Sequence, residues 1–123
     1  MLSLPPSVRI FVSREPVDMR KGFDSLAQLV RSHLGGDPLS GHLFVFRSKR
    51  GDRLKVLYWD ADGLCLFYKR LELGTFELPR EGTSVGAHGL EIGAGDLALL
   101  LEGIDLSSAR RRPRYQRPKA VPA

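Results

Sequence analysis

The sequence of residues 40–70 is SGHLFVFRSKRGDRLKVLYWDADGLCLFYKR. Apolar residues alternate with polar ones in three runs, and a period of two is typical of strands that bury one face. Two polar turns separate the runs, and the second contains Asp62-Gly63, a strong signal for a tight hairpin. The stretch therefore predicts a three-stranded antiparallel meander, which decides the fold class.

The lengths of the two turns set the register of this meander. A five-residue turn at 48–52 places Phe46 opposite Leu54, and a four-residue turn at 60–63 places Val56 opposite Phe67. One face then gathers the predicted core: Phe44, Phe46, Leu54, Val56, Tyr58, Cys65 and Phe67. The other face carries a predicted row of arginines: Arg47, Arg53 and Arg70. Like charges directly opposite one another destabilise a sheet, so an anion or acidic side chains are expected over this row.

Further elements flank the meander. Residues 7–12 predict a first strand, and Asp18 is a plausible N-cap for a helix over 19–34 that Gly35-Gly36 ends. Residues 80–95 are rich in glycine and predict a loop with one short strand at most, and a second helix is expected at about 94–102. The predicted fold class is α+β, with an antiparallel sheet of four to five strands and two helices.

Length and composition predict a single domain over residues 1–106. A chain of 123 residues is long enough to form its own core. The single cysteine, Cys65, excludes an intramolecular disulfide and fits a reducing compartment. We find neither a signal peptide nor an apolar run of the ~20 residues that cross a bilayer, so a cytoplasmic protein without membrane association is expected.

The positive charge is concentrated in the C-terminal tail. The net charge is +5, and six cations but no acid follow residue 106, which leaves thirteen basic against fourteen acidic residues in the remainder. Proline and arginine dominate residues 107–123, and this composition predicts a disordered tail. Such a tail can attach to nucleic acid without sequence choice, or it can be a solvated terminus without function.

Two surfaces are candidates for binding. The first combines cations with aromatic rings on the sheet, as a phosphate-rich polymer requires. Its predicted DNA-binding residues are Arg20, Lys21, Arg47, Lys49, Arg50, Arg53, Lys55 and Arg70. The alternative is that the sheet arginines pair with acidic side chains and that Arg20 and Lys21 are merely exposed beside a capped helix. The second surface would bind a protein partner through Trp59, Tyr68, Leu97, Leu100 and Leu101.

Sequence motifs give little support to catalysis. His33, His42 and His88 lack metal-ligand spacing, and Cys65 has no CxxC partner. No P-loop, GxSxG or GxGxxG occurs. We therefore expect neither an enzyme nor a bound metal or cofactor. A small enzyme or nucleotide-binding protein is the weaker alternative, and it would require a concave pocket with convergent polar groups.

Three blocks of sequence resemble one family. They are DMRKGFDSLAQLV at 18–30, the run from Ser40 to Pro79, and LALLLEGIDL at 97–106. In this order and spacing they resemble the TnpB-type (Orf2-like) accessory proteins of insertion sequences of the "sixty-six" family, over roughly residues 1–106. The resemblance implies a non-catalytic accessory protein for DNA transposition, with DNA and the transposase of the same element as partners. The alternative is an adaptor that binds the transposase without contacting DNA.

Overall fold

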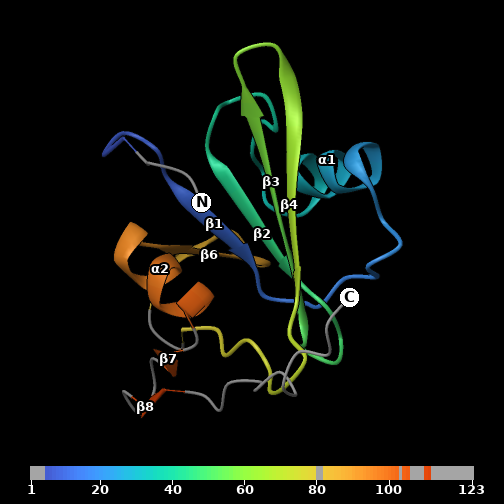
Figure 1. Cartoon of the computed structure of the whole chain (residues 1–123). Coiled ribbons are helices and arrows are strands. Elements are labelled where there is room, and N and C mark those ends of the chain that lie inside the picture. The colour runs from blue at the N-terminus through green and yellow to red at the C-terminus, as the bar shows by residue number, and fades with distance from the viewer. Residues whose placement is uncertain (1–4, 80–81, 103, 106–109, 112–123) are drawn as a thin grey trace, which may run out of the picture.

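The fold is built on a six-stranded mixed sheet. A computed structural model describes residues 5–79, 82–102, 104–105 and 110–111. The strands are β1 (Ile10–Ser13), β2 (Leu43–Arg47), β3 (Arg53–Asp60), β4 (Gly63–Arg70), β5 (Thr83–Val85) and β6 (Gly89–Ile92). Their order is β4-β3-β2-β1-β6-β5 (Figure 1), and only β1 and β2 are parallel neighbours. A short separate ribbon pairs β7 (Ile104–Asp105) with β8 (Arg110–Arg111).

A helix covers each face of the sheet. α1 (Phe23–Ser32) buries Leu26, Ala27 and Val30 against one face, which presents Phe44, Phe46 and Leu57. α2 (Ala94–Glu102) buries Leu97 and Leu100 against the other face, which presents Val45, Leu54 and Val56. The two helices lie on either side of the strands in Figure 1. The sheet is therefore the middle layer of three, which explains why four of the five residues of β2 are buried.

The α+β class and the two helices are confirmed, but the strand count is higher than expected. Residues 80–95 contribute both β5 and β6, where at most one short strand was predicted. Their glycine content concealed them, because glycine is depleted in strands. Gly89 shows why a glycine is needed there, since an added Cβ would lie 2.7 Å from the carbonyl oxygen of Val85.

The predicted register of the second hairpin is confirmed, and that of the first is wrong by one residue. Val56 pairs with Phe67 and Arg53 with Arg70, whereas Arg47 rather than Phe46 pairs with Leu54. The first turn closes over four residues, because the amide of Ser48 donates to the carbonyl of Arg53 at 3.0 Å. A slip of one residue moves every side chain of a strand to the opposite face. The predicted single core face is thus divided between the two faces.

The helix start is also later than predicted. α1 begins at Phe23 with Gly22 as its N-cap, and Asp18 instead organises a turn in which its carboxylate accepts the amide of Arg20 at 2.8 Å. The carbonyls of Met19 and Lys21 accept hydrogen bonds from the buried Lys55 ammonium group. They are therefore not available for a helix over 19–22. The helix ends at Ser32, two residues before the predicted end, and Gly35 follows with a φ of 63° that suits glycine.

Two further predictions concern the tail and the membrane. The disordered tail predicted for 107–123 lies outside the described residues, apart from positions 110–111. In the described part of the chain, neither α1 nor α2 has the length and apolar character that crossing a bilayer requires.

Candidate nucleic-acid interface

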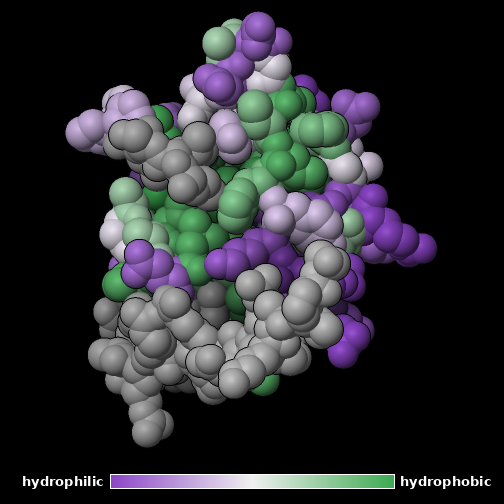
Figure 2. All heavy atoms as spheres, in the orientation of Figure 1, coloured by the Kyte–Doolittle hydropathy of each residue, from purple (hydrophilic) through white to green (hydrophobic). Residues whose placement is uncertain are grey.

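The polar connection between β1 and α1 lies against the turn between β2 and β3. The 14–22 loop is held there because the Val17 amide donates to the carbonyl of Arg47 at 2.9 Å. Between this loop and the basic turn (residues 48–53) lies a groove of about 470 Å³, here called the turn groove. Hydrophilic side chains gather along the side of the molecule on which both segments project (Figure 2). The turn groove is therefore open to solvent, with charged residues on both of its sides.

Charges of both signs line the turn groove: Lys49, Arg50 and Arg53 are basic, and Asp18 and Asp52 are acidic. Lys49 and Arg50 are exposed, and among the described residues no ion pair or side-chain hydrogen bond occupies them. Arg53 lies 3.3 Å from the hydroxyl of Tyr68 through its Nη1 atom. The carboxylate of Asp18 is taken by Arg20, whose hydrogen bonds lower the pKa of Asp18 to about 2. A phosphate entering the groove would thus meet two unpaired cations.

Lys55, by contrast, is a structural residue. Its side chain is only 5% exposed, and its ammonium donates to the carbonyls of Met19 and Lys21, each at 2.7 Å. The ammonium also lies 4.6 Å from the centre of the Tyr68 ring, within the range of a cation–π interaction. Lys55 therefore fixes the 14–22 loop on the sheet, and its predicted position among exposed DNA-binding cations is wrong.

The predicted row of three arginines does not form. Arg53 and Arg70 are cross-strand partners, as predicted, but Arg70 also pairs with Glu72 at 2.9 Å. The corrected register places Arg47 on the α2 face, where its Nη1 donates to the carbonyl of Phe76 at 3.1 Å. Of the predicted DNA-binding residues, Lys49, Arg50 and Arg53 share the turn groove, with Arg20 beside it.

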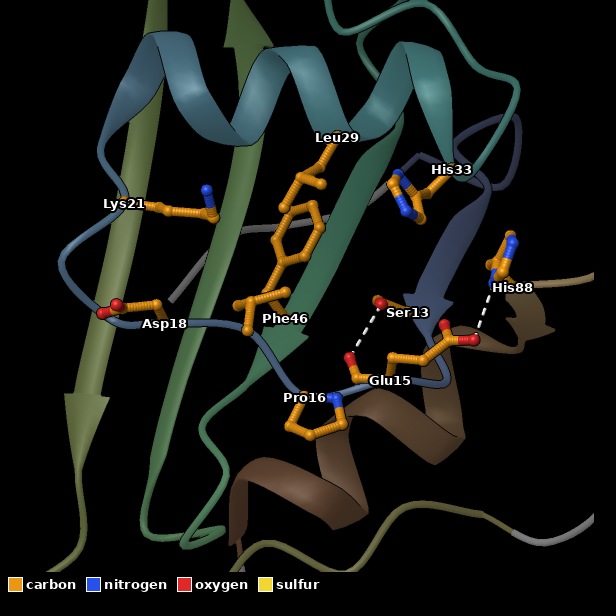
Figure 3. A pocket seen from close by; sticks show the side chains of 10 residues that line it. Ser13, Glu15, Pro16, Asp18, Lys21, Leu29, His33, Phe46 and His88 are labelled. Carbon is orange, nitrogen blue, oxygen red and sulfur yellow. Dashed lines mark hydrogen bonds and ion pairs between the residues drawn. The ribbon is translucent and has the colours of Figure 1, made fainter.

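A second hollow lies between α1 and the sheet. This helix cavity has a volume of about 260 Å³, and its lining includes Val17, Lys21, Leu29, Phe46 and His88 (Figure 3). Near its rim His88 approaches Glu15 at 2.6 Å, and this hydrogen bond lowers the pKa of Glu15. In the parts of the chain that the structure describes, no group of three or more potential ligands is placed to hold a metal.

The sequence did not reveal this cavity. Its lining comes from β1, the 14–22 loop, the second half of α1 with the residue that follows it, β2 and the β5–β6 turn. His33 and His88 are 55 positions apart in sequence, yet their rings lie 5.0 Å apart. Neither residue has a neighbour in sequence that signals this meeting. Only the order of the strands, which places β6 beside β1, brings the two histidines together.

Comparisons with known proteins connect the chain to insertion sequences. The family model described as IS66 Orf2 like protein matches residues 8–111. The chain belongs to this family. It is 40% identical over 121 residues to the uncharacterised protein y4jC of Sinorhizobium fredii, covering 98% of this chain and 99% of that relative. It is 43% identical over 105 residues to y4hO of the same organism, covering 85% and 88% of the two chains. No solved structure matches significantly.

Membership in the IS66 Orf2-like family associates the chain with the transposition of insertion sequences. It does not assign partner-binding residues, and the structure exposes only some of the predicted ones. Leu97 and Leu100 are 2% and 1% exposed, so these two cannot form a surface for a partner. Both side chains instead pack α2 against the sheet. Trp59 and Leu101 are half-buried, and Tyr68 is exposed.

Proposed function

We propose that this IS66 Orf2-like protein is a non-catalytic accessory factor that contacts DNA during transposition of its insertion sequence. The observation that carries the proposal is the turn groove, where Lys49 and Arg50 are exposed and Arg53 lies beside them. Phosphate contacts supply most of the affinity of sequence-independent DNA binding. Family membership supports a role in transposition, and the exposed cations of the turn groove support contact with DNA phosphates.

The salt dependence of binding to a duplex oligonucleotide tests this proposal. Removing one cation that neutralises a phosphate reduces the slope of log K against log salt by about 0.9. The double change Lys49→Ala and Arg50→Ala is therefore expected to lower the slope by about 2. Arg31→Ala is the matched control, because Arg31 is exposed in the last turn of α1, outside the turn groove.

The basic tail must be separated from the turn groove. Replacing the six tail cations with glutamine removes non-specific attraction while keeping the chain length. The double change is expected to weaken binding in both the native and the neutralised chain. If neutralising the tail abolishes binding and the double change has no effect, the turn groove does not bind DNA.

One observation favours a second candidate, an adaptor that binds the transposase. β4 ends the sheet, and all eight of its residues are at least partly exposed. Among the described residues no strand pairs with its outer edge, so a peptide could add there by β-augmentation. Co-purification with the transposase that survives nuclease treatment would favour this candidate over DNA contact.

A further inference from the structure

The helix cavity has the composition of a site for a flat, partly polar group. Its accessible apolar walls are the half-buried Leu29 and Val17, and Phe46 lies almost fully buried among the lining residues. Figure 3 shows the Phe46 ring directed at Leu29, and the Lys21 side chain extending toward them from the start of the α1 region. Apolar walls with a few polar groups at the mouth are typical of small-ligand sites.

Hydrogen bonds hold the walls of the cavity in place. Lys55 fixes the backbone of Met19 and Lys21 on one side. On the other side His88 approaches Glu15 at 2.6 Å, and the Ser13 hydroxyl donates to the Glu15 carbonyl at 2.9 Å. The cavity is therefore formed before any ligand arrives, and binding there would cost little ordering of the protein.

The helix cavity and the turn groove lie on either side of one segment. Pro16, Val17 and Asp18 line both hollows. A polymer whose phosphates lie against Lys49 and Arg50 could therefore insert a neighbouring group past this segment into the cavity. The rim offers a donor in the Lys21 ammonium and an acceptor in the Glu15 carboxylate, the two kinds of group that read the edge of a base.

We propose that the helix cavity receives one unstacked base of single-stranded DNA, while the basic turn holds the neighbouring phosphates. The inference rests on the proposed function and deepens it by naming the form of DNA that is bound. A base stacked within a duplex cannot reach a recessed cavity, so the site distinguishes unpaired from paired DNA. An apolar side chain of a protein would make no use of the Lys21 ammonium at the rim.

The first experiment uses the full-length protein and short single-stranded oligonucleotides. An oligonucleotide with one base removed is compared with the intact strand, and the abasic position is moved along the sequence. Stacking of one base on a protein surface contributes about 1–3 kcal/mol, which corresponds to about 5- to 150-fold in affinity. We expect about a tenfold loss at one position, and tighter binding of the single strand than of the duplex.

The second experiment fills the cavity. Leu29→Trp is expected to weaken single-strand binding about tenfold and to leave duplex binding unchanged. Leu39→Trp is the matched control, because Leu39 is 48% exposed and lies outside the cavity. Melting curves establish that each variant folds, and the abasic series on the native protein decides the question if Leu29→Trp does not.

The possible outcomes separate this inference from the proposed function. If abasic strands bind as tightly as intact ones while Lys49→Ala and Arg50→Ala weaken binding, the base site is wrong and DNA contact stands. If Leu29→Trp disrupts only co-purification with the transposase, the cavity binds a protein side chain, and the inference is overturned. If the protein binds no DNA at all, both proposals are wrong.

Discussion

At the scale of single residues, charge and exposure do not coincide in this protein. Lys49 and Lys55 are six positions apart along one hairpin, but Lys49 is exposed and Lys55 is buried. Lys55 donates to two backbone carbonyls, and Arg47 donates to a third. The cations visible in the sequence are therefore a mixture of residues that can meet a ligand and residues that hold the fold.

Replacing Lys55 with methionine is expected to destabilise the fold by about 2–3 kcal/mol. The aliphatic stem is retained, but the carbonyls of Met19 and Lys21 lose a charged donor, and such hydrogen bonds contribute about 1.5–3 kcal/mol. Urea unfolding measures the change. Lys49→Met, on the exposed turn, should stay within about 0.5 kcal/mol of the native protein, and equal losses for the two variants would contradict the role given to Lys55.

The carboxyl group of Asp18 is expected to titrate near pH 2. Hydrogen bonds from Arg20 lower its pKa from the ordinary 3.8 to about 2. Because the folded pKa lies below the unfolded one, the pairing stabilises the fold above about pH 4 and is lost as the pH falls through 2. The effect on stability is small, since both side chains are largely exposed. NMR titration of the carboxyl carbon checks the midpoint, which Arg20→Gln should raise toward 3.8.

At the scale of elements, the sequence predicted the helix and the hairpin that have a local pattern. It failed at the β2–β3 hairpin, where a single side chain sets the register. The spacing predicted a helix face of Phe23, Leu26, Ala27, Val30 and Leu34. All but Phe23 are buried, and Phe23 is 47% exposed. The β3–β4 register is the predicted one, although its loop is only Ala61 and Asp62, because Asp60 pairs with Gly63. The β2–β3 register does not follow from composition, because the residues at 48–52 are compatible with a four-residue turn and with a five-residue turn. Hydrogen bonds at the base of the turn set the register, because Ser48 Oγ accepts the amides of Gly51 and Arg53.

Ser48→Ala is therefore expected to lower the free energy of unfolding by about 1–2 kcal/mol. The hydroxyl is buried, and its loss leaves the amides of Gly51 and Arg53 without this acceptor. Ser25→Ala, on the exposed face of α1, is the control and should leave stability unchanged. A native-like denaturation midpoint for Ser48→Ala would mean that the turn length is set by something else, such as the positive φ of Gly51.

At the scale of the whole molecule, burial of both sheet faces explains why the candidate site was only partly predictable. The sequence predicted one sheet face in the core and one face with a row of arginines. In the structure α1 and α2 each bury a face, and the cations are left mainly at the turns and edges. Lys49, Arg50 and Arg53 were identified correctly as neighbours, because they are close in sequence. The helix cavity was missed because its lining depends on the position of β6 beside β1.

The strand order also constrains how this chain reaches its fold. β2, β3 and β4 are consecutive hairpins that can pair as soon as they are made. β1 lies between β2 and β6, and its pairing with β6 joins residues 10–13 to residues 89–92. Contacts between such distant segments form slowly, because a long loop must close first. On the ribosome, β1 can pair with β2 early, but its other edge stays unpaired until residues 89–92 have been made.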